Sequence, residues 1–214
     1  MTKIFLVSFC SVDDIIFLKE KYKNKDILVG VDQGTKMLID NGLTPDYIVG
    51  DFDSFLVGSN LAEKSKIIRL PKEKSESDLE CALKLFLNFS SDKNKPIQCS
   101  IIIINNMLGR LDHILTSLHL LEQGANICIW SAMQQIYFVS SKFEAELSLG
   151  TTLSLVPVTA KVKVCTSGLK YHLDNEYLYR KKTRGLSNIS VSRLIKISVK
   201  NGCLFVIINS KKGI

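Results

Sequence analysis

The residues with the clearest chemical potential are two aspartates, Asp51 and Asp53, which follow a short apolar run. This run, residues 47–49, is typical of a strand, so both carboxylates stand where the chain leaves a sheet. Like charges at this spacing repel each other, and a cation such as Mg²⁺ bound between them and phosphate oxygens would relieve the repulsion. A solvated acidic turn explains an isolated pair equally well, so the choice depends on other segments.

Two more acidic residues stand at comparable places. Asp32 follows the apolar run 27–31 and precedes a helical pattern. Asp78 closes the polar run 73–78 and opens another helix, where the helix dipole alone would favour a carboxylate. In the same run, Lys74 offers a point charge for a phosphate group. Each residue has a local explanation, but all stand at a predicted strand end or helix start.

A fourth segment, residues 105–113, follows the apolar run 100–104. It contains a flexible glycine, the guanidinium of Arg110, which suits bidentate contact with phosphate, and the carboxylate of Asp112 beside an imidazole. The sequence has neither a P-loop nor a dinucleotide-binding glycine motif. Acidic residues in four segments, each at a predicted strand end or helix start, therefore indicate metal-assisted phosphoryl chemistry, with carboxylates on Mg²⁺ and basic groups on a nucleotide.

Positioning these residues requires a sheet whose strand ends share one edge. Up to residue 139, short apolar runs alternate with helix-period segments near residues 12–22, 35–41, 78–89 and 111–122. This order predicts a mainly parallel α/β sheet with helices on both faces, which binds ligands beyond the carboxyl ends of its strands. The predicted strands are residues 3–9, 27–31, 47–50, 66–70, 99–104 and 126–130.

The pattern changes after Val139, and residues 140–214 are predicted to form an all-β sandwich. Short alternating runs at 152–156, 162–165, 194–199 and 204–208 are separated by turn residues, and Asn201-Gly202 is typical of a hairpin. The charge changes as well: residues 1–139 carry 15 Lys and Arg against 17 Asp and Glu, and residues 140–214 carry 13 against 4.

Composition limits where the protein acts. The chain has 214 residues, of which 46% are hydrophobic, but no apolar run approaches the roughly 20 residues that span a bilayer. The N-terminus lacks the pattern of a signal peptide. The six cysteines form no C-x-x-C pair, which favours reduced thiols. The basic residues lie on alternating strand patterns without an aromatic RNA-binding signature. We therefore predict a cytoplasmic protein that binds neither membrane nor nucleic acid.

Taken together, the polar segments resemble those of the thiamine pyrophosphokinase family. The resemblance rests on D-Q-G at residues 32–34, P-D-Y-I-V-G-D-F-D-S at 45–54, E-K-S-E-S-D at 73–78, G-R-L-D-H at 109–113, T-S-G-L-K-Y at 166–171 and G-L-S-N at 185–188. It implies a catalytic α/β domain for ATP and Mg²⁺ (1–139), a β-sandwich that binds thiamine (140–214), and a homodimer with the thiamine pocket at the subunit interface. The implied reaction transfers diphosphate from ATP to the hydroxyl of thiamine, giving thiamine diphosphate and AMP.

The resemblance also implies roles for individual residues. The catalytic residues would be Asp51, Asp53, Asp78 and Asp112, of which the first three would hold the metal. ATP would be bound by Asp32, Lys74, Ser77 and Arg110, and thiamine by Ser187 and Asn188. In-line attack of the thiamine hydroxyl on the β-phosphorus of ATP would follow, with either Asp112 or Asp53 orienting the hydroxyl or taking its proton.

The chain departs from the family's pattern at several motif positions. Ser75 replaces an acidic residue, Leu108 replaces one of two paired glycines, and Asn105 replaces the glycine that opens the same loop. His172 stands where a proline is usual. A side chain at position 108 restricts the approach of the backbone to a phosphate.

Two alternative functions stay open at the level of sequence. One is diphosphate transfer to another hydroxymethyl heterocycle, such as a pterin. The other is a non-catalytic protein that binds nucleotide or thiamine diphosphate, which Ser75 and Leu108 would suit. The four motif aspartates argue against a pure binding protein, because it would have little use for so much uncompensated negative charge.

Overall fold

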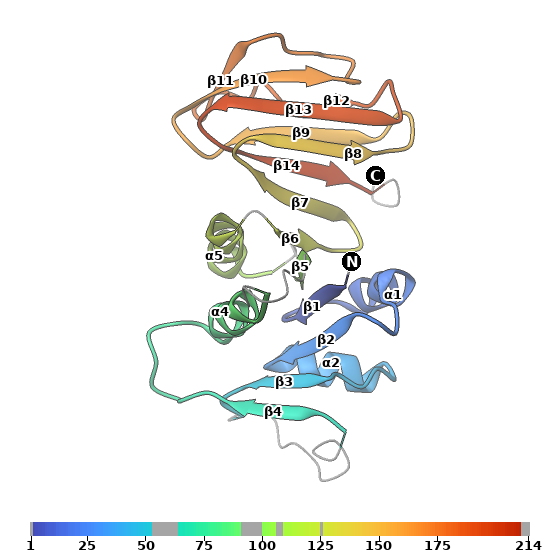
Figure 1. Ribbon diagram of the computed structural model, residues 1–214, viewed down its shortest axis with the longest axis vertical. Helices are drawn as coiled ribbons and strands as arrows, with labels where there is room; N and C mark the ends of the chain where they lie inside the picture. Colours follow the sequence, from blue (N-terminus) through green and yellow to red (C-terminus); the bar gives the residue numbers. More distant parts are fainter. Residues whose placement is uncertain (1, 53–63, 91–99, 106–108, 125, 211–214) are drawn as a thin grey trace. The chain divides into compact units, whose positions relative to one another are not determined.

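The computed structural model describes residues 2–52, 64–90, 100–105, 109–124 and 126–210. The chain divides into two compact units, Met1–Ala132 and Met133–Ile214. In Figure 1 the first unit runs from blue to green and the second from olive to red. The described residues contain no helix that is long and apolar enough to cross a membrane.

The first unit is built on parallel strands in the order β6-β5-β1-β2-β3-β4. Their bounds are β1 Lys3–Val7, β2 Ile27–Val31, β3 Tyr47–Gly50, β4 Lys66–Arg69, β5 Ser100–Ile104 and β6 Ile127–Trp130. Nearly continuous apolar sequence fits strands that are covered on both faces. The chain moves outward from β1 to β4 and then returns to place β5 on the other side of β1. This topological switch point is where ligands bind in open α/β sheets.

Among the described residues, the helices that connect these strands are α1 Val12–Lys21, α2 Gln33–Asp40, α4 Asp78–Ser90 and α5 Leu111–Leu120, and the 3₁₀ turn η1 Leu121–Gln123 follows α5. Figure 1 shows α1 and α2 on one side of the strands and α4 and α5 on the other, as right-handed crossovers require. Leu83 and Phe86 of α4 are buried together with the strand residues Phe5 and Ile48. The predicted α/β fold of the N-terminal part is confirmed.

The second unit consists of two antiparallel sheets. One has the order β12-β9-β14-β7 and the other β11-β10-β13-β8. The strands are β7 Gln134–Val139, β8 Lys142–Glu146, β9 Thr152–Pro157, β10 Lys161–Ser167, β11 Glu176–Tyr179, β12 Asn188–Ile189, β13 Leu194–Asn201 and β14 Leu204–Asn209. Because β7 pairs with β14, residues 134–139 pack with this unit, although sequence pattern and charge change only after Val139.

Alternation along these strands builds the core of the second unit. On β10 and β13, every second side chain, such as Val162, Val164, Ile195 and Ile197, is buried, and charged residues lie between them. One apolar face per sheet is the pattern of a sandwich. The predicted β-sandwich is therefore confirmed.

Candidate active site

A cavity of about 740 Å³ opens at the carboxyl ends of the strands in the first unit. Its volume falls within the range of small-molecule sites. It is lined by residues at the ends of β1, β2 and β5, by the segment that leads into α4 and its first residues, and by residues along the length of α5. Five predicted residues from three separate motifs line it: Asp32, Lys74, Ser77, Asp78 and Arg110.

Lys74 lies between two of the predicted carboxylates. Its Nζ is 2.8 Å from Oδ1 of Asp78 and 4.0 Å from Oδ2 of Asp51. It also donates a hydrogen bond to the carbonyl oxygen of Pro71, at 3.1 Å. The hydrogen bond to Asp78 is the main cause that raises the pKa of Lys74, followed by the charges of Asp78 and Asp51. Carboxylates from the end of β3 and the start of α4 thus approach one cation.

This arrangement fits a hard metal ion in its donor chemistry. Mg²⁺ in proteins is commonly held by one or two carboxylates together with substrate phosphates. Asp51 and Asp78 both lie within 4.0 Å of one positively charged atom, and Oδ1 of Asp78 is buried. The described residues contain no group of three or more His, Cys, Asp or Glu that could hold a metal by themselves. Asp53, the third predicted ligand, lies outside the described residues.

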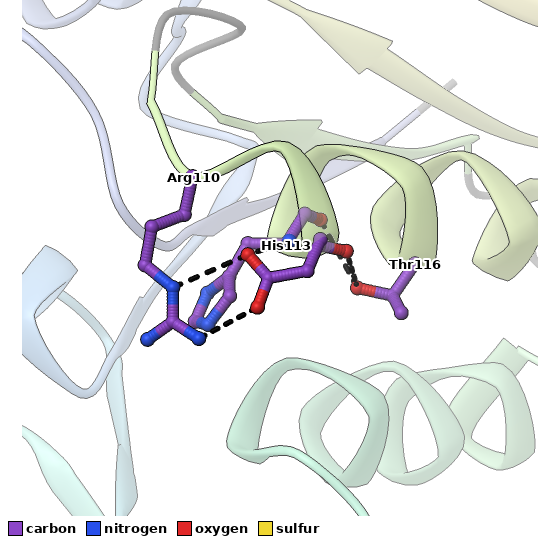
Figure 2. Close-up of polar contacts among 4 residues, drawn as sticks. Arg110, His113 and Thr116 are labelled. Atoms are coloured by element: carbon purple, nitrogen blue, oxygen red, sulfur yellow. Dashed lines mark hydrogen bonds and ion pairs between the residues drawn. The ribbon is translucent and has the colours of Figure 1, made fainter.

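Arg110 precedes the first turn of α5 and pairs with Asp112 (Figure 2). Its Nη2 donates to Oδ2 of Asp112 at 2.6 Å, and its Nε donates to Oδ1 at 3.2 Å. The hydrogen bond from Arg110 is the main reason that the pKa of Asp112 falls to about 2. Both side chains are largely exposed, and Asp112 is not among the residues that line the cavity. Asp112 is therefore a fully ionised partner of Arg110.

Asp32 is positioned by an unusual backbone conformation. It stands immediately before α2 with φ 47° and ψ −123°, and its N–H donates to the carbonyl oxygen of Val49 at 2.9 Å. Such a conformation is strained for a residue with a Cβ. Gly34, in the first turn of α2, allows a close packing contact. A Cβ at this position would lie 2.0 Å from the carbonyl oxygen of Val7, so the glycine lets α2 approach the end of β1.

Several cavity residues were not predicted as functional. His113, Thr116, Ser117 and Leu120 line the cavity and recur at the spacing of one helix face on α5. Asn105 also lines it, although the sequence marked this residue only as a departure from a glycine. The helical spacing was a usable signal for the α5 residues. No local pattern indicated a role for the side chain of Asn105.

The two predicted thiamine-binding residues lie in the second unit and differ in exposure. Ser187 is exposed, has a φ of 54°, and donates its N–H to Oγ of Ser154 at 3.0 Å. Asn188 is only 3% exposed. Its Nδ2 donates to the carbonyl oxygen of Tyr171 at 2.7 Å, and its Oδ1 accepts from the N–H of Tyr171 at 3.0 Å. The amide of Asn188 thus holds the Tyr171 turn, and the Tyr171 side chain is exposed.

Two family models match the chain. The model described as "Thiamin pyrophosphokinase, catalytic domain" matches residues 18–130, and the model described as "Thiamin pyrophosphokinase, vitamin B1 binding domain" matches residues 140–204. A curated thiamine pyrophosphokinase from Bacillus subtilis strain 168 is 28% identical over 186 residues, covering 84% of this chain and 85% of the relative.

Solved structures share the same fold. The crystal structure of thiamine pyrophosphokinase from Bacillus subtilis has a TM-score of 0.84 at 24% identity, covering 98% of this chain and 100% of that chain. Thiamin pyrophosphokinase from Candida albicans has a TM-score of 0.74 at 17% identity, covering 97% and 88%. Both similarities extend over the two units described above.

Proposed function

The chain belongs to the thiamine pyrophosphokinase family, and we propose that the cavity of its first unit is the place where it transfers diphosphate from ATP to thiamine. It is an enzyme of thiamine diphosphate biosynthesis, a diphosphotransferase that uses ATP and thiamine. The comparisons do not favour the alternatives of a pterin substrate or a non-catalytic binding protein. The observation that carries the location is the approach of Asp51 and Asp78 to Lys74 beside the cavity.

In this proposal, Asp51, Asp53 and Asp78 would hold Mg²⁺, which would supply positive charge against the migrating diphosphate. Lys74 and Arg110 contact the phosphates, since both are cations that line the cavity. Asp32 and Ser77 complete the binding of ATP. Once the β-phosphorus is held in line with the thiamine hydroxyl, catalysis follows from positioning and charge stabilisation.

The role of Asp112 follows from its contact with Arg110. A carboxylate whose pKa is about 2 is a weak base at neutral pH, because proton transfer is efficient only when the pKa lies near the working pH. We therefore assign Asp112 to the orientation of Arg110. Among the predicted catalytic residues, Asp53 then becomes the better candidate for orienting the thiamine hydroxyl or taking its proton.

Thiamine is proposed to bind at the second unit. The matched family description for residues 140–204 supports this assignment. Ser187 is exposed and available for contact, whereas Asn188 would act through the Tyr171 turn that it holds. As the resemblance implies, the enzyme would be a homodimer in which thiamine binds between the second unit of one subunit and the first unit of its partner.

The experiment that tests this function measures AMP and thiamine diphosphate formed from ATP, Mg²⁺ and thiamine. The wild type is expected to form both products in equal amounts. Asp51→Asn and Asp78→Asn each remove a carboxylate from the Lys74 cluster, and activity should fall by a factor of about 100 or more, as with the loss of one strong electrostatic contact.

Asp40→Asn is the matched control, because Asp40 is an exposed residue of the same unit that pairs with Lys36 on the surface of α2. It should leave the rate unchanged. Normal turnover by Asp51→Asn and Asp78→Asn at ordinary Mg²⁺ would overturn the metal assignment. If the folded wild type forms neither product, the activity itself is wrong.

A further inference from the structure

Asn105 lies at the topological switch point of the first unit. It directly follows β5, and the adjacent β1 continues beside it, where the N–H of Ser8 donates to the carbonyl oxygen of Ile104 at 3.1 Å. Asn105 is only 6% exposed, yet it lines the cavity. A buried amide needs hydrogen-bond partners, because leaving its polar atoms unpaired is costly.

A short hydrogen-bond chain fixes the orientation of the Asn105 amide. The hydroxyl of Ser117 lies 2.7 Å from the carbonyl oxygen of His113, which can only accept, so the hydroxyl must donate there. The same Ser117 oxygen therefore accepts from Asn105, at 2.8 Å, and only Nδ2 of the amide can donate. Oδ1 of Asn105 consequently faces away from Ser117.

Oδ1 of Asn105 opens into the cavity. Oδ1 of Asn105 accepts no hydrogen bond among the residues that the structure describes, and it is not one of their buried side-chain atoms without a partner. The oxygen of Asn105 is therefore not sealed inside the protein, and its residue lines the cavity. The fixed amide thus presents a hydrogen-bond acceptor to a bound ligand.

The surroundings of Asn105 suit a heterocyclic base more than a phosphate. Leu79, Ile114 and Leu120 line the same cavity and supply apolar walls. The cations that would attract phosphates, Lys74 and Arg110, lie in the segments that precede α4 and α5, whereas Leu120 is the last residue of α5. The ten positions from Arg110 to Leu120 correspond to about 15 Å along a helix. The phosphates and the base of one nucleotide can therefore occupy different parts of the cavity. Because Oδ1 of Asn105 is a hydrogen-bond acceptor, it would repel a phosphate group.

We propose that Asn105 reads the base of the bound nucleotide by accepting a hydrogen bond from the 6-amino group of adenine. This inference rests on the proposed nucleotide cavity and adds the residue that sets its base preference. A 6-oxopurine such as hypoxanthine or guanine would turn its own acceptor oxygen toward Oδ1, leaving both oxygens without a donor. Because Nδ2 is held by its hydrogen bond to Ser117, the amide cannot flip to donate a hydrogen bond to the oxygen of such a base.

The test compares dissociation constants for ATP and ITP, which differ only in the 6-substituent and N1 proton of the purine. The wild type is expected to bind ATP more tightly than ITP. Asn105→Ala and Asn105→Gly should reduce this preference by about 3- to 10-fold, the equivalent of one net hydrogen bond. Ser117→Ala keeps Asn105 but frees its amide to rotate, so it should reduce the preference as well. The exposed Asn24→Ala provides the control.

Several outcomes would overturn the inference. One is a wild type with equal affinity for ATP and ITP, and another is an Asn105→Ala variant that loses affinity for both nucleotides equally. If Asn105→Ala instead reduces the preference for ATP over 2′-deoxy-ATP or 3′-deoxy-ATP, the oxygen reads the ribose and the base assignment is wrong. If Asn105→Ala does not fold, the test uses Ser117→Ala: an unchanged preference for ATP over ITP in this folded variant would also overturn the inference.

Binding and turnover separate this inference from the proposed function. An Asn105-dependent preference for ATP without formation of AMP would support base recognition and contradict the diphosphotransferase assignment. Normal formation of AMP and thiamine diphosphate, with a base preference that is unchanged in Asn105→Ala, would support the diphosphotransferase assignment and contradict base recognition by Asn105.

Discussion

At the scale of single residues, the Arg110–Asp112 pair leads to a prediction about pH. Its contact with Arg110 lowers the pKa of Asp112 to about 2, so the carboxylate is ionised at every pH where the enzyme is assayed. Asp112→Asn removes the acceptor that orients Arg110 and should lower kcat by a factor of about 10 to 100. The pH profiles of kcat/KM for variant and wild type should remain parallel between pH 5 and 9.

A profile that loses one ionisation in Asp112→Asn would contradict this assignment and make Asp112 the general base. Glu122→Gln serves as the control, because Glu122 is an acidic residue that pairs with His119 near the end of α5, away from Arg110. It should change neither the rate nor the shape of the profile.

At the scale of elements, the sequence predicted what depends on local patterns. The strands and helices of the first unit are examples: the strand predicted at residues 27–31 is β2, and the helix predicted near residues 78–89 is α4. What it missed depends on residues far apart in the chain. The amide of Asn105 is oriented by its hydrogen bond to Ser117, and the amide of Asn188 is hydrogen-bonded to the backbone of Tyr171, 17 positions away. Neither partner follows from spacing alone.

The packing of α2 gives a prediction for this scale. Gly34→Ala would place a Cβ 2.0 Å from the carbonyl oxygen of Val7, and backbone on both sides must shift. We expect a loss of about 1–3 kcal/mol in the free energy of unfolding, together with weaker binding of ATP because Asp32 precedes the same helix. Urea unfolding followed by fluorescence of Trp130, the only tryptophan of the sequence, reports on this unit.

Gly42→Ala is the matched control at the other end of α2. Gly42 has a φ of 76°, but a Cβ there would meet nothing within 4 Å. The substitution should cost only about 1 kcal/mol, for the left-handed backbone, and ATP binding should be unchanged. Equal losses for the two variants would mean that the close approach of α2 to β1 does not matter.

At the scale of the whole molecule, the proposed functions are divided between two units. The cavity with its carboxylates and cations is lined by the first unit, and the residues proposed for thiamine are in the second.

Substitutions in the second unit should therefore change the KM for thiamine without changing the binding of ATP. Asn188→Ala would release the Tyr171 turn, and the KM for thiamine should rise by about tenfold, the equivalent of one or two hydrogen bonds. The dissociation constant of ATP should stay the same.

The proposed homodimer makes a sharper prediction when these variants are combined. In a symmetric dimer whose site joins the first unit of one subunit to the second unit of its partner, an Asp51→Asn/Asn188→Ala heterodimer has one intact site and one site with both defects. The heterodimer, purified through two different tags after co-expression, should therefore show about half of the wild-type activity at limiting thiamine. Each variant homodimer should stay far below this value. If both parts of a site belonged to the same chain, each site of the heterodimer would carry one defect and its activity would stay low. A fully active monomer would contradict the proposal that the site is shared between subunits.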